Sequence, residues 1–152
     1  MTPRRTPEPR NHAAGVPVRA VSVARPWAGL ILHRGKDVEN RTWSTRYRGL
    51  LVIHASQSWD QWPDDIARQF ALPADKGGHP TGYLGVAELV DVHRHTDDRQ
   101  CSPWAEPSTW HWCLTNPRPF PHPIPGPGRL GLYTPPPAVV TAARAACSGG
   151  GV

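Results

Sequence analysis

The segment from residue 33 to residue 56, HRGKDVENRTWSTRYRGLLVIHAS, constrains the fold more than any other part of the chain. Gly35 is suited to the left-handed conformation that ends a helix, and Lys36 follows directly, so we expect the ammonium in a tight turn. Glu39, Arg41 and Trp43 then alternate along an extended run, which places them on one side of a strand. That face offers a carboxylate, a guanidinium and an indole, which together can hydrogen-bond a flat polar ring and stack on it.

The rest of the chain predicts several short strands and few helices. A strand at 20–24 precedes a short helix that begins at Arg25-Pro26-Trp27 and ends at Gly35. A second helical region, capped by Ser56 or Ser58, is expected to contain DDIARQF. Further strands are expected at about 37–43 and about 48–55, and from residues 82, 109 and 129. The pattern predicts an α+β fold, a small mixed β-barrel with about two flanking helices.

Composition and charge bound the kind of partner. The 152 residues suffice for one domain, and the net charge is +5 with fifteen arginines among the seventeen basic residues. Arginine pairs with phosphate and stacks on bases, so an anionic partner is favoured. A coding bias toward arginine, in line with the high alanine, proline and glycine content, explains the same charge equally well.

Both ends of the chain are expected to be disordered. Residues 1–17 mix proline with arginine, and residues 135–152 read PPPAVVTAARAACSGGGV, so neither segment is expected to bury much surface. The predicted organisation is a basic tail at 1–17, one domain at 18–134 and a second tail at 135–152.

Cysteine usage and the lack of long apolar runs indicate the compartment. The three cysteines form no CxxC pair, which argues against a disulfide framework and for a reducing environment, with the cytoplasm as the default. No apolar run approaches eighteen residues and no secretion signal is present, so no membrane association is predicted. The oligomeric state cannot be predicted from the sequence.

Glu88 interrupts the most apolar stripe of the sequence. In GYLGVAELVDV, counting by twos puts Leu84, Val86, Glu88 and Val90 on one face. A buried carboxylate needs a partner. It therefore either forms a structural ion pair with an arginine or lines a cleft, where Lys36 is the natural partner.

Tryptophans and arginines supply the other candidate binding residues. Trp27 and Trp43 are expected near Lys36, where an indole can stack on a nucleobase. Trp110 shares a strand face with Trp112, for which core packing is the competing interpretation. Four arginines are expected to bind the phosphates that flank such a base: Arg25, Arg41, Arg46 and Arg48. Arg48 has a structural alternative, which is to tie its turn to nearby carbonyls.

Ligand-capable side chains occur late in the chain without a recognised metal pattern. They are His93, His95, Cys101, His111 and Cys113, and their spacing fits no standard zinc motif, so no metal site is predicted. His54 is interpreted as a satisfied strand histidine rather than a general base. No GxSxG, glycine-rich phosphate loop or HExxH occurs, and we expect no cofactor.

The chain resembles the ASCH domain family (activating-signal-cointegrator homology), within the PUA-like superfamily. The resemblance rests on SVARPWAGLILHRGKDVENRTW, YRGLLVIHAS, GYLGVAELVDV, WHWCL and GRLGLY, and covers roughly residues 19–134. It implies an aromatic-lined cleft that holds a flipped or single-stranded base, often a modified one. It also implies that Glu88 faces this cleft.

Three functional classes follow from the residues and the resemblance. In the first, the domain reads single-stranded RNA or a modified nucleobase, with Lys36 and Glu88 bonding the base edge and Trp27 or Trp43 stacking on it. In the second, it is an enzyme. Similar compact proteins hydrolyse N4-acetylated cytidine with a lysine, a threonine three residues later and a glutamate on a later strand. Lys36 and Glu88 match the first and the last of these, but the residue three after Lys36 is Glu39. A carboxylate is a poorer acyl acceptor than an alkoxide. Other members of the family are linked to ribonuclease activity. The third class is a protein-interaction module.

Overall fold

The protein folds around one five-stranded mixed sheet, described here from a computed structural model. The described residues are 16–60, 68, 69, 71, 78–94 and 101–148. The strands follow the order β1-β3-β4-β5-β2, in which β1 runs parallel to β3 and the other neighbours are antiparallel. The strands are β1 (Val18–Arg25), β2 (Val38–Arg41), β3 (Gly49–Trp59), β4 (Gly82–Arg94) and β5 (Trp110–Ile124).

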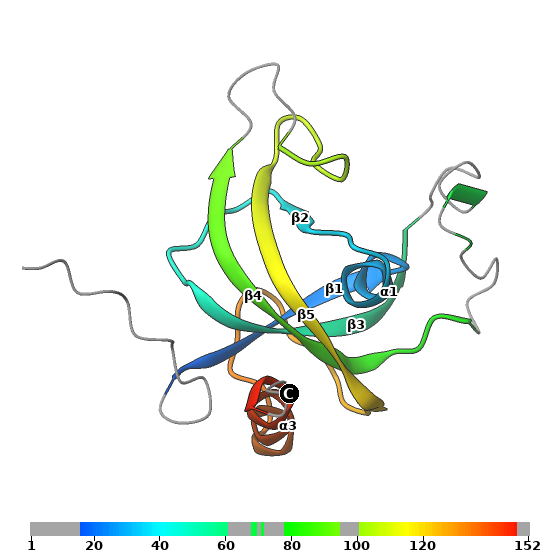
Figure 1. Cartoon of the computed structure of the whole chain (residues 1–152), viewed down its shortest axis with the longest axis vertical. Helices are drawn as coiled ribbons and strands as arrows, with labels where there is room; N and C mark the ends of the chain where they lie inside the picture. Colours follow the sequence, from blue (N-terminus) through cyan, green and yellow to red (C-terminus); the bar gives the residue numbers. More distant parts are fainter. Residues whose placement is uncertain (1–15, 61–67, 70, 72–77, 95–100, 149–152) are drawn as a thin grey trace, which may run out of the picture.

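Two helices complete the described fold, α1 (Trp27–His33) and α3 (Pro137–Ser148). Figure 1 shows the strands bending strongly, with α1 beside the sheet and α3 below it. The predicted α+β class is confirmed. The sheet is barrel-like but open, because β1 and β2 stand at the two ends of the strand order. A hydrogen bond of 2.6 Å from Arg41 Nη2 to the Ser22 carbonyl oxygen joins these two end strands.

Both faces of the central strands are buried, in two separate apolar clusters. Leu51, Ile53 and Leu89 pack with α1 and Trp112 in the first cluster, whereas Leu50 and Val52 pack with α3 in the second. Alternation along β3 sends successive side chains to opposite faces. Runs of consecutive apolar residues in β3 and β4 are therefore explained by cover on both sides.

The end of α1 follows the sequence-based expectation. Gly35 has a φ of 73°, in the left-handed region where glycine is unstrained. The backbone N–H groups of Arg34 and Lys36 both bond to the Leu30 carbonyl oxygen, at 3.0 Å and 3.1 Å. This turn directs Lys36 away from solvent, and its side chain is buried.

The expectation of a disordered segment at 135–152 is wrong for Pro137–Ser148, which form α3. Val139 and Ala143 are four residues apart and so share one helix face, and both are buried against the second cluster. Arg118 Nη1 donates to the Ala146 carbonyl oxygen at 3.0 Å, which satisfies an acceptor in the last turn. The folded unit therefore extends beyond residue 134.

Two other expected elements differ from the structure. The strand predicted from residue 129 is reduced to one antiparallel bridge between Ala20 and Tyr133. Ser56 and Ser58 do not begin a helix, because β3 continues through Trp59. The DDIARQF segment lies mostly outside the described residues, as do residues 1–15 of the predicted basic tail and His95.

Candidate functional site

A cavity of about 290 Å³ opens beside the turn that follows α1. It is called the Lys36 cavity here. Its lining comes from the start of α1, the β2 region, the end of β3 and a segment before β5: Trp27, Lys36, Glu39, Asn40, Asp60, Pro103, Trp104, Ala105 and Glu106. Four parts of the chain that are distant in sequence thus meet at one hollow.

Lys36 lies in this cavity with its ammonium held by three neighbours. Its side chain is only 4 % exposed, and Nζ donates to the Val38 carbonyl oxygen at 2.5 Å. Nζ also lies 3.7 Å from Glu39 Oε1 and 5.7 Å from the centre of the Trp27 ring. Burial of an ammonium is tolerated here because a carbonyl, a carboxylate and an indole face all surround it.

Glu39 links the cavity to the sheet. One carboxylate oxygen, Oε1, accepts a hydrogen bond of 3.1 Å from the Asn40 N–H, and the other, Oε2, lies 3.7 Å from Arg41 Nη2. The side chain is 9 % exposed. Glu39 therefore stands between two cations, Lys36 and Arg41.

Asn40 pins the segment that forms the opposite wall of the cavity. Its Nδ2 donates to the Trp104 carbonyl oxygen at 3.0 Å, and its Oδ1 accepts from the Glu106 N–H at 2.9 Å. Ser102 adds a second tie, because its hydroxyl bonds to Asp37 Oδ1. These bonds hold Trp104 against the cavity opposite the β2 region.

The lining carries more negative than positive formal charge. Lys36 is its one cation among the described residues, whereas Glu39, Asp60 and Glu106 are carboxylates. Asp60 also accepts a hydrogen bond of 2.8 Å from Trp27 Nε1, which orients that ring. A phosphate is therefore a poor fit inside the cavity, and a neutral or cationic ring is a better one.

The structure brings Trp27, Lys36 and Glu39 together but places Trp43 and Trp110 elsewhere. Trp43 packs edge-on against the buried Trp112, with ring centres 4.8 Å apart. Trp110 lies beneath Arg94, whose guanidinium carbon is 5.8 Å from the ring centre. Neither ring lines the Lys36 cavity.

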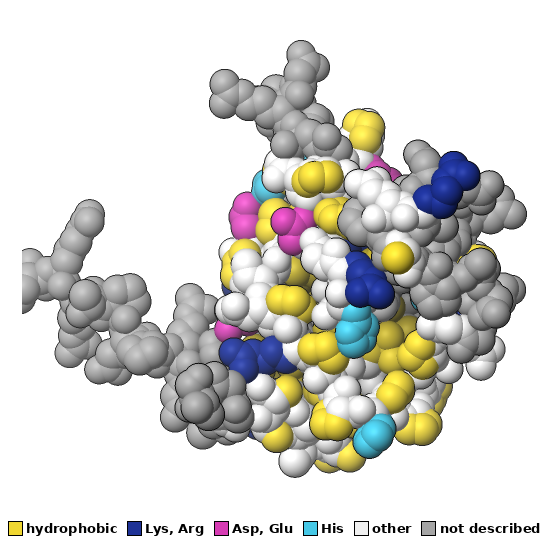
Figure 2. Space-filling model, turned by 45° about the vertical axis from the view of Figure 1, so that its right-hand side comes forward, with side chains coloured by type: hydrophobic (Ala, Val, Ile, Leu, Met, Phe, Trp, Pro, Cys, Tyr) yellow, Lys and Arg dark blue, Asp and Glu magenta, His cyan; other side chains and the backbone are white. Residues whose placement is uncertain are grey.

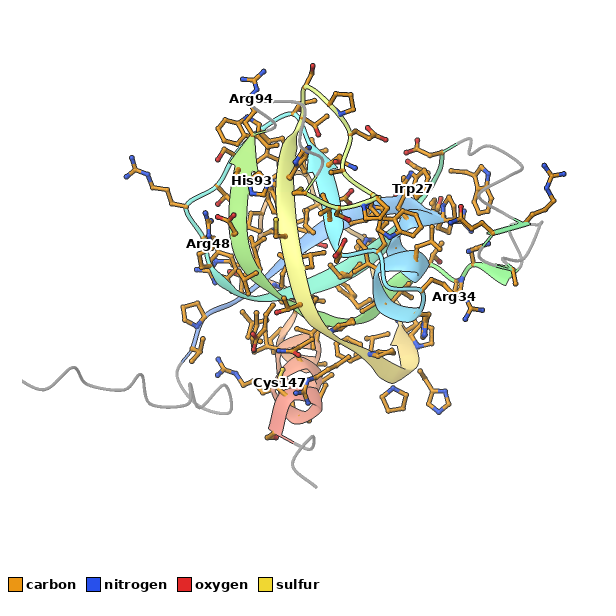
Figure 3. All side chains as sticks on the ribbon, turned by 45° about the horizontal axis from the view of Figure 1, so that its top comes forward. Trp27, Arg34, Arg48, His93, Arg94 and Cys147 are labelled. Atoms are coloured by element: carbon orange, nitrogen blue, oxygen red, sulfur yellow. The ribbon has the colours of Figure 1, made fainter. Side chains whose placement is uncertain are left out.

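The expected meeting of Lys36 and Glu88 does not occur, and this corrects the sequence-based site. Glu88 pairs in register with Leu50, and directly paired residues of neighbouring strands share a face. Leu50 belongs to the cluster covered by α3, and the Glu88 carboxylate contributes to raising the pKa of Cys147 on that helix, after the larger effect of burial. Figure 3 shows Trp27, the first residue of α1, well away from Cys147 on α3.

Three of the four predicted phosphate-binding arginines donate hydrogen bonds to backbone carbonyl oxygens. Arg25 donates to the carbonyl oxygens of Gln57 and His79, and Arg41 donates to that of Ser22. Arg48 donates to the carbonyls of Thr45 and Tyr47, which confirms its structural alternative. Arg46 is exposed. On the face drawn in Figure 2, basic side chains are scattered and do not form one patch.

Sequence reasoning missed six lining residues, four of them with polar or aromatic side chains: Asn40, Asp60, Trp104 and Glu106. The segment that carries Trp104 gives no signal of a site in the sequence, since its proline and charged residues are typical of an exposed loop. Asn40 had a signal, because it alternates with Val38 inside the strand next to Glu39, where an asparagine is uncommon without a hydrogen-bonding role.

Comparison with known protein families bears on this arrangement. A family model of the ASCH domain matches residues 21–123, about two thirds of the chain. The chain belongs to the ASCH domain family. The match includes α1, β2, β3 and β4 together with the whole lining of the Lys36 cavity, and it ends before α3. A search of curated proteins found no match.

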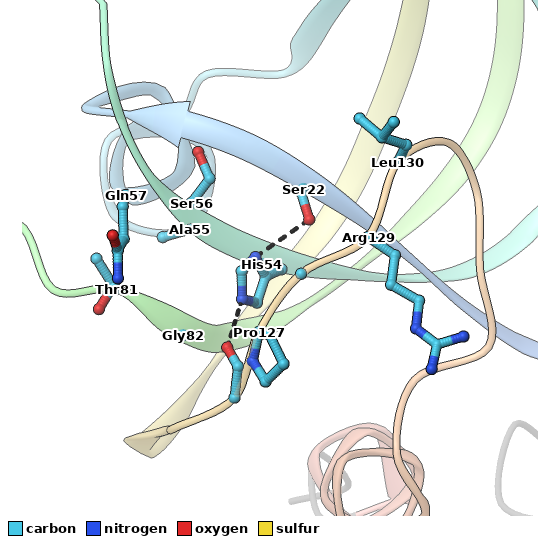
Figure 4. A pocket seen from close by; sticks show the side chains of 12 residues that line it. Ser22, His54, Ala55, Ser56, Gln57, Thr81, Gly82, Pro127, Arg129 and Leu130 are labelled. Carbon is cyan, nitrogen blue, oxygen red and sulfur yellow. Dashed lines mark hydrogen bonds between the residues drawn. The ribbon is translucent and has the colours of Figure 1, made fainter.

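The ASCH domain has a second hollow, of about 400 Å³, at the opposite end of β3 from Gly49. Its centre is His54, which is buried; its Nδ1 lies 3.2 Å from Ser22 Oγ and its Nε2 lies 2.8 Å from the Gly126 carbonyl oxygen, as Figure 4 shows. Both ring nitrogens thus have partners, which agrees with the interpretation of His54 as a satisfied strand histidine. We therefore regard the Lys36 cavity as the better candidate site.

Among the described residues, neither helix has the length and apolar character that crossing a membrane requires.

Proposed function

We propose that this ASCH domain binds single-stranded RNA by taking one base, unmodified or modified, into the Lys36 cavity. The observation that supports the proposal most is the buried Lys36–Glu39 pair in a cavity lined by Trp27 and Trp104. Base-recognition sites combine hydrogen-bonding groups for a base edge with aromatic side chains for its face. This cavity has both.

Lys36 and Glu39 supply complementary groups for a base edge. An ammonium has three N–H bonds, and Val38 and Glu39 engage two of them among the described residues. The third can donate to a carbonyl oxygen or ring nitrogen of a base. Glu39 can accept from an exocyclic amino group or a ring N–H.

Size and charge favour a base over a whole nucleotide. A volume of about 290 Å³ is at the lower end for small-molecule sites. The three carboxylates repel phosphate, so the backbone of a bound strand stays at the surface. We expect a weaker salt dependence than for a protein with one large basic patch.

The test is a fluorescence titration with short single-stranded RNA. Stacking on tryptophan quenches its emission, and each stacked base contributes about 1–3 kcal/mol. Trp104→Ala and Lys36→Met should each weaken binding by about tenfold or more, whereas Trp110→Phe, outside the cavity, should bind like the parent. A flat titration at low salt, or equal binding by Lys36→Met, would remove the proposal.

A second candidate is a small amidohydrolase acting on N4-acylated cytidine, and the burial of Lys36 beside a carboxylate favours it. A lysine side chain that reaches a bound amide can act as a base or nucleophile in its cleavage. Glu88 does not line the cavity, so Glu39 would have to act as the carboxylate. Release of acetate from N4-acetylcytidine by the parent and not by Lys36→Ala would establish turnover. Release at the same slow rate by both proteins would be background.

The ribonuclease and protein-interaction alternatives are separated by the same samples. Shortened RNA after the titration would indicate cleavage.

We further propose a cytoplasmic location, which the free thiols of Cys101, Cys113 and Cys147 support. Cell fractionation tests it.

A further inference from the structure

A cluster of metal-ligating side chains lies at the end of β4 and the start of β5, outside the Lys36 cavity. His93 and His111 face each other in register across the two strands, with ring centres 5.4 Å apart. Cys101 reaches them from the segment before β5, and one potential ligand atom from each residue lies within 4.8 Å of the others. Figure 3 marks His93 near the end of β4, next to Arg94. Their sequence spacing fits no zinc motif, but the strand pairing brings them together.

The distance between Cys101 and His111 fits tetrahedral zinc. Cys101 Sγ lies 3.4 Å from His111 Nδ1. Zinc binds sulfur at about 2.3 Å and imidazole nitrogen at about 2.0–2.1 Å, so a tetrahedral angle puts the two ligand atoms about 3.5 Å apart. These two ligands need almost no rearrangement.

Neighbouring acceptors fix both imidazoles in tautomers that can bind a metal. His111 Nε2 lies 2.6 Å from the Glu106 carbonyl oxygen, which can only accept, so Nε2 carries the proton and Nδ1 presents its lone pair toward Cys101. His93 Nδ1 lies 2.8 Å from Asp91 Oδ2, which leaves Nε2 as its lone-pair nitrogen. A second hydrogen bond of this kind, from imidazole to carbonyl or carboxylate, is the usual support of a metal-binding histidine.

A neighbouring group, Asp91, His93 and Cys113, is the weaker alternative. Its Asp91 and His93 atoms already bond to each other, so a metal there would have to replace that bond. The group with two imidazoles and one thiol matches the ligands that zinc prefers.

We propose that His93, Cys101 and His111 bind one Zn²⁺, with water as the fourth ligand and Asp91 orienting His93. The ion would tie the segment that carries Trp104 to β4 and β5. Cys101 binds as the thiolate, so one proton is released for each ion bound.

The full-length chain can be titrated with Co²⁺, which takes the place of zinc and reports its ligands. A thiolate-to-cobalt absorption band and tetrahedral visible bands should grow to one equivalent, and Zn²⁺ should bleach them. Cys101→Ser should lose the band and weaken Zn²⁺ binding at least about tenfold. Cys101 is exposed, so this variant should fold, and circular dichroism checks that it does.

Two matched variants complete the experiment. Cys113→Ser and Cys147→Ser each remove one thiol and should keep the cobalt band. Absence of a thiolate band in the parent would overturn the proposal. So would a band that survives in Cys101→Ser and disappears in Cys113→Ser, because the ion would then use the other group.

Discussion

The absence of a side chain at Gly128 allows the loop after β5 to lie close to the sheet. A Cβ on Gly128 would lie 2.1 Å from Ser22 Oγ and 2.6 Å from His54 Nδ1. Real Cβ atoms do not come this close to such atoms, so any larger residue must push the loop or the Ser22–His54 pair aside. Glycine at this position allows the loop to accept the His54 hydrogen bond at Gly126.

Gly128→Ala should therefore destabilise the protein by about 1–3 kcal/mol, the usual range for overpacking a filled site. Gly29→Ala is a matched control in α1, because its Cβ would meet only His79 Nδ1 at 4.0 Å. Alanine is the better helix former, and this control should be neutral or stabilising by about 0.5–1 kcal/mol. Urea unfolding midpoints of the two variants measure the difference. Equal midpoints would show that the loop moves to make room for the alanine side chain without loss of stability.

At the scale of elements, α3 determines what the second face of the sheet contacts. Val139 is 1 % exposed and packs in the cluster with Leu50, Val52 and Val86. Without α3 this apolar face would meet water. The helix therefore belongs to the folded unit, although the family match ends before it.

Val139→Asp should destabilise the protein by about 3 kcal/mol or more, because it places a carboxylate in an apolar cluster. Ala138→Asp is the control. Residue 138 is exposed in the first turn of the helix, where a negative charge is favourable, so this variant should unfold like the parent. Thermal unfolding followed by circular dichroism distinguishes them. If both melt like the parent, α3 does not contribute to stability.

For the whole molecule, several buried acids predict sensitivity to alkaline pH. Burial raises the pKa of Tyr83 above its usual value, with a smaller contribution from Tyr133, and burial also raises the pKa of Tyr47 and of Cys147. The folded state thus keeps protons that the unfolded chain releases above about pH 9 for cysteine and about pH 10 for tyrosine. The stability from these groups is complete below about pH 9 and falls as pH rises beyond it.

Urea unfolding at about pH 8 and about pH 10.5 should show a loss on the order of 1 kcal/mol from Tyr83 alone. Tyr83→Phe should be less stable at the lower pH, since it loses the hydrogen bond to the Pro127 carbonyl oxygen, but its stability should fall less between the two. The same slope in both proteins would show that Tyr83 does not titrate differently in the folded state.

Much of the local structure could be predicted because the sequence encodes it over a few residues. Gly35 ends α1 as expected, and the alternation of Glu39 with Arg41 correctly predicts strand β2. The site was predictable only in part. Lys36, Glu39 and Trp27 lie within one short segment, whereas Trp104 and Asp60 reach the same cavity from distant parts of the chain.

Glu88 shows where sequence reasoning stops. Alternation along β4 separates its two faces only in part, because the register shifts between Tyr83 and Gly85 and puts Leu84 in the first cluster and Val86 in the second. A period of two also does not say which face meets α1 and which meets α3. The segment that forms α3 was expected to be disordered, so no sequence pattern placed Glu88 on the face that this helix covers.

The sequence by itself determined the family, the α+β class, and the turn that directs Lys36 inward next to Glu39. These features depend on glycine conformation and on side-chain alternation, which act between near neighbours. Only the tertiary structure decided that Glu88 lies under α3, that Trp104 walls the Lys36 cavity, and that His93 and His111 meet Cys101. Those contacts depend on strand register and on which helix covers which face, and both are fixed by packing between segments far apart in the chain.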